Sequence, residues 1–157
     1  NEDGFFSRNG KRLGLTLLVN REDSRRTAAA ALIASQLSEA GIEVETLEKT
    51  FAEYTALLAS GEYEMYLGET RLKYNMDISA LLPGGSSAYS AAADEELAAA
   101  YLRWRSGGSL SAFNAVFAEQ TPFSPLLFRC GAVVFSRSLS YDIISTEQDI
   151  FYNIIDW

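Results

Sequence analysis

Hydrophobic and polar positions follow two alternating periodicities in the first part of the chain. Residues 13–19 form a nearly continuous apolar run of strand length, which is typical of a strand covered on both faces. A helix is predicted next. Asp23 or Ser24 can cap its start, apolar residues recur at helical spacing after them, and Gly41 is a typical helix stop. Residues 42–47 alternate apolar and polar side chains, as a half-buried strand does. This pattern predicts a βαβ unit.

The unit repeats directly afterwards. Thr50 and Glu53 have the spacing of a capping box, and apolar residues at helical spacing follow as far as Gly61. Residues 63–67 then read as a third strand. Strand, helix, strand, helix and strand joined by short connections predict an α/β fold with a parallel sheet and right-handed crossovers.

The regular pattern breaks in the second half. Residues 68–93 form a long irregular stretch, and loops of that length are usually functional or disordered. Helices are expected to start at Asp94 and at Ser109, since each can cap an apolar stripe. The apolar, β-prone residues 126–128 predict a fourth strand, and residues 132–135 a fifth.

Composition narrows the possible functions. The chain has 157 residues, 48% of them hydrophobic and 22% charged, which suits one globular domain. A net charge of -8 disfavours nucleic acid as a partner. No histidine is present, which excludes a Ser-His-Asp triad and a His-ligated zinc site, and Cys130 alone cannot form an internal disulfide. The apolar runs are shorter than the ~20 residues that span a bilayer.

Two clusters of carboxylates raise the possibility of acid–base catalysis. Asp94, Glu95 and Glu96 fall in the opening turn of a predicted helix, where acids favour the helix dipole. The second cluster, on the polar side of an alternating strand, is Glu43, Glu45 and Glu48. Neither arrangement places two carboxyls in different environments around one substrate, and no phosphate-binding glycine loop is present. We therefore expect no enzyme activity, no cofactor and no metal site.

A ligand surface remains as the candidate site. In open α/β sheets, small molecules bind outside the carboxyl ends of the strands. The loops that follow the first and third predicted strands mix hydrogen-bonding groups with an aromatic ring, as a polar ligand requires. The predicted ligand-binding residues are Asn20, Arg21, Gly68, Glu69, Thr70, Arg71, Lys73, Tyr74 and Asn75.

A series of short segments carries a resemblance through its order and spacing. The segments are Asp3-Gly4, Asn9-Gly-Lys-Arg-Leu13, Leu15-Thr-Leu-Leu-Val-Asn20, Ala40-Gly-Ile-Glu-Val44, Tyr89-Ser90 with Asp94-Glu-Glu-Leu97, Pro125-Leu-Leu-Phe128, and Phe151-Tyr-Asn-Ile with Trp157. Together they resemble the second lobe of the family 5 extracellular solute-binding proteins, the oligopeptide, dipeptide and nickel-binding type of ABC importers. The resemblance covers nearly all of this chain but one lobe of a longer protein.

The resemblance implies a fold and a domain organisation. It implies a three-layer lobe like that of type II periplasmic binding proteins, with a mostly parallel central sheet and helices on both faces. Residues 1–157 would then be a single lobe excised from a two-lobe protein. Within it, residues 1–138 would form the α/β core, and residues 139–157 a return segment toward the missing second lobe.

The resemblance also implies a function. Such a lobe captures a peptide or another small polar solute in a cleft between two lobes that close by a hinge, without covalent chemistry. An ABC permease would be its partner for transmembrane transport. The protein would work in the periplasm or, as a lipoprotein, on the extracellular face of the cell membrane, with membrane contact only through a lipid anchor outside this segment.

One departure from the family pattern concerns the solute. Peptide-binding members carry, after the third strand, a tryptophan and then an aspartate that pairs with the amino terminus of the peptide; Thr70 and Lys73 stand at those positions here. A cation in place of the aspartate repels an ammonium group, so ordinary capture of a peptide's amino terminus is not expected. Two interpretations remain open for Lys73 and Arg71: they favour a carboxylate or another anionic group, or they point into solvent.

Two other classes of function remain as alternatives. The same lobe can be reused as a sensory or interaction domain, and adjacent permease and ATPase genes or a fused signalling domain would distinguish transport from sensing. A hydrolase that acts through carboxylates is the third possibility, and it would require turnover that a single Asp or Glu substitution abolishes.

Overall fold

The computed structural model describes residues 4–73, 75–90, 94–129, 132, 134–136, 142–146 and 149–156. The chain divides into two compact units, Asn1–Arg71 and Leu72–Trp157. The first unit contains the β1 strand Ser7–Arg8, β2 Lys11–Arg12, β3 Gly14–Asn20, helix α1 Ser24–Glu39, β4 Glu43–Lys49, α2 Phe51–Ser60 and β5 Met65–Tyr66.

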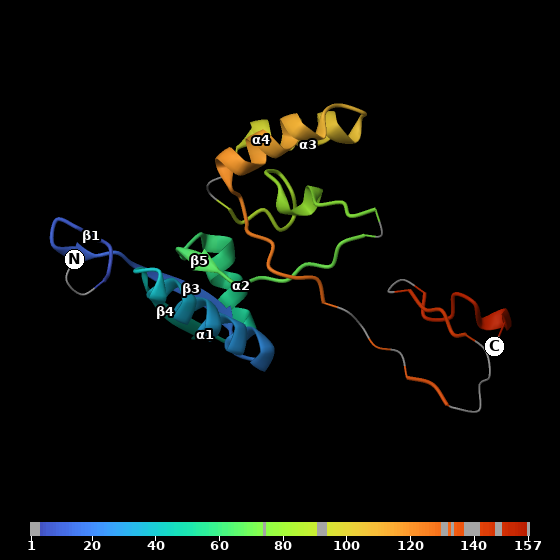
Figure 1. Cartoon of the computed structure of the whole chain (residues 1–157), viewed down its shortest axis with the longest axis horizontal. Helices are drawn as coiled ribbons and strands as arrows, with labels where there is room; N and C mark the ends of the chain where they lie inside the picture. The colour runs from blue at the N-terminus through green and yellow to red at the C-terminus, as the bar shows by residue number, and fades with distance from the viewer. Residues whose placement is uncertain are drawn as a thin grey trace. The chain divides into compact units, whose positions relative to one another are not determined.

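The first unit is built around a parallel sheet of three strands in the order β4-β3-β5 (Figure 1). The chain moves from the central strand β3 to one neighbour and then crosses to the other neighbour. With right-handed crossovers, this reversal of direction places α1 and α2 on opposite faces of the sheet. The predicted parallel α/β arrangement with helices on both faces is confirmed in this unit.

The central strand β3 is covered on both faces. Leu17 and Val19 pack with Ala30 of α1, and successive strand residues point to opposite faces, so Leu18 faces away from α1. Leu18 is only 1% exposed, and α2, which contacts β3, buries Leu58. The apolar run is nearly continuous because β3 is covered on both faces, as the sequence predicted.

The ends of the helices follow their sequence signals. Asp23 accepts hydrogen bonds from the first backbone N–H groups of α1, and Thr50 and Glu53 form the expected reciprocal capping box at the start of α2. Gly41, directly after α1, has φ +88°, and a Cβ there would lie 2.7 Å from the backbone oxygen of Gly4. Only glycine meets both constraints without strain.

The third strand is shorter than the five residues predicted. Glu64, just before β5, turns its carboxylate onto β3 and accepts hydrogen bonds from the backbone N–H of Thr16 at 2.6 Å and from its hydroxyl at 2.8 Å. A side chain thus takes the backbone donor that a longer strand would have paired. These hydrogen bonds from Thr16, the hydroxyl first, lower the pKa of Glu64 below its ordinary value.

The second unit is mainly helical where it is described. It contains a 3-10 turn, η1 Ser79–Leu81, the helices α3 Glu95–Arg105 and α4 Leu110–Gln120, and a second 3-10 turn, η2 Ile154–Asp156. Asp94 and Ser109 cap α3 and α4 as predicted. The core is aromatic: Trp104 of α3 stacks on Phe113 of α4 with ring centroids 5.6 Å apart and planes 10° apart.

The prediction of a fourth strand is wrong. Residues 126–128 are irregular, and the side chains of Leu126, Leu127 and Phe128 are 60%, 74% and 72% exposed. The fifth strand is also not found at the described positions of residues 132–135, whereas Val133 lies outside the described residues. A strand needs a neighbour for its backbone hydrogen bonds, and an apolar, β-prone run does not supply one.

We predict that Glu64→Ala destabilises the first unit, because it leaves the backbone N–H of Thr16 without its acceptor. Since the pKa of Glu64 is lowered on folding, its contribution is fully present above the ordinary value of 4.5 and disappears as the pH falls through the lower folded value. Urea unfolding of the 157-residue chain at pH 7 and pH 3 should show a gap to the wild type that narrows in acid.

The matched control is Glu62→Ala, which removes an exposed carboxylate two residues away. Glu62 is hydrogen-bonded to the Leu57 carbonyl through its backbone N–H, which the substitution keeps. An equal loss in both variants at pH 7 would contradict the role given to Glu64.

Candidate functional site

Five of the predicted ligand-binding residues lie at one edge of the parallel sheet. Leu18 of β3 is opposite Tyr66 of β5, and the two strands run in the same direction. Asn20 and Gly68 each lie two residues beyond this pair, so the chain leaves the sheet at the same level after both strands. Arg21 follows the first of them, and Glu69 and Thr70 follow the second.

Asn20 is buried at the carboxyl end of β3 and shapes the turn into α1. The residue is only 7% exposed, and its Oδ1 accepts a hydrogen bond from the backbone N–H of Glu22 at 3.1 Å. This Asx-type turn fixes the backbone that leads to the helix. Among the described residues, no acceptor is placed for the Asn20 carboxamide nitrogen.

Arg21 is held through its backbone rather than its side chain. The Arg21 N–H donates to the carbonyl of Lys49 at 2.8 Å, so the turn after β3 is joined to the end of β4. The Arg21 side chain is exposed, and its charge, with that of Lys49, helps to lower the pKa of Glu53, to which hydrogen bonds from Thr50 contribute most.

An ion-pair cluster joins the two loops at this edge. The guanidinium of Arg26 places Nη2 3.0 Å from Glu69 Oε2 and Nε 3.4 Å from Asp23 Oδ2. Desolvation raises the pKa of Asp23, but hydrogen bonds from the backbone N–H groups of Arg26 and Arg25 and the charges of both guanidinium groups lower it overall. These carboxylates are therefore ionised partners of a cation and a helix terminus rather than free acids.

The segment after β5 lies closely against the sheet. The Leu67 N–H donates to the Leu18 carbonyl at 3.0 Å, and the hydroxyl of Tyr54 in α2 donates to the Leu67 carbonyl at 3.1 Å. A Cβ at Gly68 would come within 2.8 Å of the Tyr66 ring, so a larger residue here would displace the ring or the chain. Thr70 and Arg71 beyond it are exposed.

The remaining predicted residues belong to the second unit. Lys73 and Asn75 are exposed, and Tyr74 lies outside the described residues. Asn75 Oδ1 accepts the N–H of Asp77 at 3.2 Å, and the Asn75 carbonyl accepts Arg105 Nη1 at 3.3 Å. Both of these hydrogen bonds fix the loop itself. Solute binding by the nine predicted residues stays a prediction.

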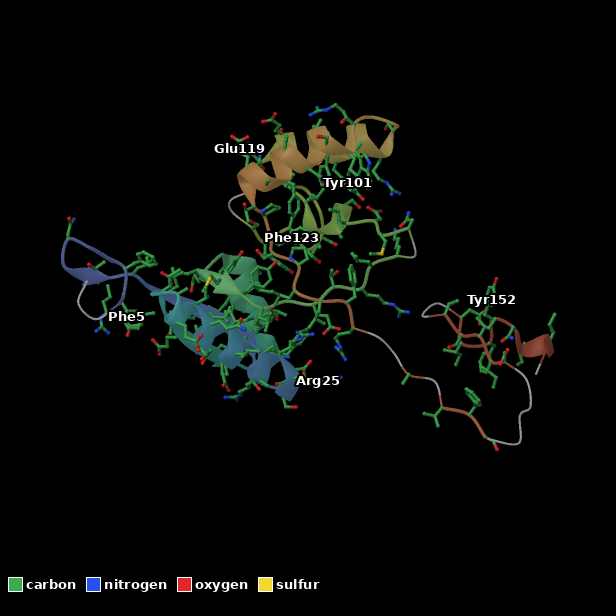
Figure 2. The ribbon with its side chains drawn as sticks, viewed as in Figure 1. Phe5, Arg25, Tyr101, Glu119, Phe123 and Tyr152 are labelled. Atoms are coloured by element: carbon green, nitrogen blue, oxygen red, sulfur yellow. The ribbon has the colours of Figure 1, made fainter. Side chains whose placement is uncertain are left out.

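A further polar network in the second unit was not predicted as a unit from the sequence. Asp77 Oδ1 accepts the N–H of Ser79 at 3.0 Å and the hydroxyl of Tyr101 at 2.9 Å, and the Tyr101 oxygen accepts the N–H of Ile78 at 3.1 Å. Figure 2 shows Tyr101 extending from α3 toward the segment that carries η1. The spacing of Asp77 and Ser79 is a local turn signal, but the tyrosine lies 24 residues further on.

This network strongly favours the ionised form of one carboxyl. The hydrogen bonds from Ser79, backbone first, and then from Tyr101 lower the pKa of Asp77 to about 2. Burial is the main reason that the pKa of Tyr101 is raised. A hydrogen-bonded carboxylate that is ionised at all ordinary pH values anchors a loop and is a poor general acid.

Other features of the described chain limit the chemistry further. An open surface hollow of about 430 Å³ lies in the second unit, lined among others by Ser79, Leu82, Pro83 and Tyr101, and none of its lining residues carries a carboxylate. Across the described ranges, no group of three or more His, Cys, Asp or Glu side chains could hold a metal ion. None of the helices placed in the structure is both long and apolar enough to cross a bilayer.

We predict that Asn20→Ala costs roughly 1 kcal/mol of unfolding free energy, since it removes the acceptor of the Glu22 N–H at a half-buried turn. Asn20→Ser is the matched control, because its hydroxyl can form the same turn more weakly. Urea unfolding of the 157-residue chain should rank the wild type above the serine variant and the serine variant above the alanine variant; an alanine variant as stable as the wild type would contradict this role.

We also predict that Tyr101→Phe raises the pKa of Asp77 from about 2 toward 3.8, because the carboxylate loses one of its hydrogen-bond donors. Carboxyl carbon shifts followed by NMR as the pH is lowered would measure it. Tyr152→Phe, at a residue 65% exposed, is the control. An unchanged Asp77 titration in the Tyr101 variant would show that the hydroxyl contributes nothing to the network.

No protein-family model and no curated protein matches this sequence. Solved structures do match its fold. The unliganded open form of MppA, a periplasmic murein tripeptide-binding protein, matches with a TM-score of 0.61 at 19% identity, over 73% of this chain and 24% of MppA.

Two further solved structures match with similar coverage. NikZ from Campylobacter jejuni, in complex with Ni(L-His), has a TM-score of 0.56 and 17% identity over 78% of this chain and 27% of its own. AppA from Bacillus subtilis, an oligopeptide-binding protein in complex with a nonapeptide, has a TM-score of 0.52 and 20% identity over the same shares.

The chain thus spans about a quarter of the length of the structures that it matches. All three are family 5 solute-binding proteins, so the resemblance read from the sequence is confirmed at the level of the fold. Over about three quarters of its length, this chain has the fold of part of a family 5 solute-binding protein.

Proposed function

We propose that this chain is the ligand-binding lobe of an ABC-importer solute-binding protein, which captures a peptide or another small polar solute without covalent chemistry. The observation that carries the proposal is the joint placement of Asn20 and Gly68 at the carboxyl edge of a parallel sheet, in a fold shared with solute-binding proteins. Ligands of open α/β sheets bind at such an edge. The other half of the cleft would come from a second lobe of the same protein.

The chemistry of the edge supports binding rather than catalysis. Two of its carboxylates, Asp23 and Glu69, are paired with the Arg26 guanidinium, and the pKa of Asp23 is lowered below its ordinary value by the hydrogen bonds and charges of Arg26 and Arg25. The groups left for a solute are the Asn20 carboxamide nitrogen and the exposed polar side chain of Thr70. A few fixed polar groups of this kind orient a ligand and leave it unchanged.

The solute class follows from the departures at Thr70 and Lys73. MppA is a tripeptide-binding protein and AppA is in complex with a nonapeptide, which supports a peptide-like solute. An ammonium group is repelled by Lys73, whereas a carboxylate or another anionic group is attracted. We therefore propose a small solute with an exposed anionic group, or a peptide whose amino terminus is not the recognised end.

The setting proposed for this lobe is outside the cytoplasmic membrane. MppA is periplasmic, which supports the periplasm or the outer face of the membrane. Delivery to an ABC permease, and a lipid anchor if the protein is a lipoprotein, belong to the same proposal. Import in this form needs only reversible closure of two lobes on the solute.

Titration of the intact two-lobe protein by calorimetry tests the proposal. The panel would contain free di-, tri- and oligopeptides, the same peptides with acetylated amino termini or amidated carboxyl termini, and small anionic solutes. We expect saturable binding by at least one class and no turnover of the bound solute. The absence of binding across the whole panel, or release of a chemically altered solute, would overturn the proposal.

The role of Lys73 in choosing the solute gives a sharper prediction. Lys73→Asp should strengthen the binding of peptides with a free amino terminus relative to their acetylated forms by roughly tenfold, since it restores an anion where the cation stood. The matched control is Lys11→Asp, which makes the same change of charge in β2, before the chain enters the parallel sheet. Equal preferences in the two variants would show that Lys73 does not face the solute.

A further inference from the structure

Arg26 occupies a place in α1 that helix stability does not explain. It lies in the first turn of the helix, where a cation opposes the positive end of the helix dipole, and no acidic residue of that turn offsets it. Asp23 already caps this terminus by accepting the N–H groups of Arg25 and Arg26 at 3.0 and 3.3 Å. The reason for the guanidinium must therefore be sought in what it contacts outside the helix.

The contact with hydrogen-bond geometry is the one to the other loop. Arg26 Nη2 donates to Glu69 Oε2 at 3.0 Å, across 43 residues of sequence. Toward Asp23 the guanidinium is less well aligned: Nε lies 3.4 Å from Oδ2, yet this buried N–H has no hydrogen-bond partner. In the orientation that reaches Glu69, the Arg26 side chain thus leaves its Nε donor unpaired. A hydrogen bond from Nε to Asp23, which is closer in sequence, would be the local alternative.

We propose that Arg26 is a positioning residue of the solute site, which fixes the segment Gly68–Thr70 to the N-terminal turn of α1 before a solute arrives. The segment is then held from three elements. Leu67 is hydrogen-bonded to β3 through its N–H and to Tyr54 of α2 through its carbonyl, and Glu69 is held by α1 through Arg26. Regular pairing ends with β5 at Tyr66, the backbone hydrogen bond of Leu67 to β3 follows it, and the contact of Glu69 with Arg26 then holds the segment two residues further on.

The consequence for binding is preorganisation, which rests on the proposed function of this edge. A loop that is already ordered does not lose conformational freedom when the solute binds, whereas a free loop does, and affinity falls accordingly. The Arg26 side chain is only 24% exposed and its charge is shared with two carboxylates. Its effect on a solute should therefore act through the position of the loop rather than through direct attraction.

Hydrogen–deuterium exchange on the intact protein without solute tests the positioning role directly. In Arg26→Gln we expect the Leu67 amide, which donates to the Leu18 carbonyl where this segment leaves the sheet, to exchange at least several-fold faster than in the wild type, while the amides of β3 and β4 are unchanged. The control is Arg25→Gln, which removes the same charge one residue earlier on α1. The Arg25 side chain is 74% exposed, and the ion pair given for it among the described residues is to Asp23, at 3.7 Å.

Solute affinity provides the second readout. Arg26→Gln should weaken binding by roughly fivefold to tenfold with little change in the thermal midpoint, and Arg25→Gln should leave it near the wild-type value. The exchanged pair Arg26→Glu with Glu69→Arg should restore slow exchange at Leu67. If Arg26→Gln does not fold, Arg26→Lys takes its place, since it keeps the charge but not the planar fork.

Two results would overturn the proposal. Exchange at Leu67 that is as slow in the Arg26 variant as in the wild type would show that the loop does not depend on Arg26. Faster exchange over the whole first unit would make Arg26 a general stabiliser. Failure of the wild-type protein to bind any solute counts against the proposed function alone, because the exchange experiment needs no ligand.

Discussion

Burial of β3 on both faces is the constraint from which the candidate site follows. A strand with a nearly continuous apolar run is buried between two layers, and its backbone then needs a neighbour on each side. The chain meets this need by passing from β3 to β4 and then back across to β5. Because a helix crosses over between each strand and the next, both neighbours run parallel to β3, and Asn20 and Gly68 leave the sheet at one edge. The position of the site is therefore a consequence of packing.

Electrostatics then decides what the edge can do. The formal charge of the chain is -8, but at this edge Asp23, Glu53 and Glu69 are paired with a guanidinium, with backbone N–H groups or with a hydroxyl. Such partners stabilise the ionised form, and the pKa values of Asp23 and Glu53 are lowered as a result. Carboxylates held in this way shape loops and helix ends.

Local signals explain which parts of the fold could be predicted. The caps at Asp23 and Thr50 and the stop at Gly41 act within one turn of chain, so sequence spacing is enough to find them. The Asn9-Gly10 turn of the β1–β2 hairpin was also readable, since both residues adopt the positive φ that this pair favours, but it was not used to predict strands. The strand predicted at residues 126–128 failed because its partner, unlike a cap, cannot be read from neighbouring residues.

The sequence by itself determined the βαβαβ order, the helix ends and the loops that would carry the polar groups, because hydrophobic period and capping chemistry are local. Only the tertiary structure decided how those groups are used. Arg26 meets Glu69 across 43 residues and Tyr101 meets Asp77 across 24, and no periodicity encodes such pairs. A residue's contacts across the fold depend on how its element is rotated and packed, and that is settled only when the whole core is assembled.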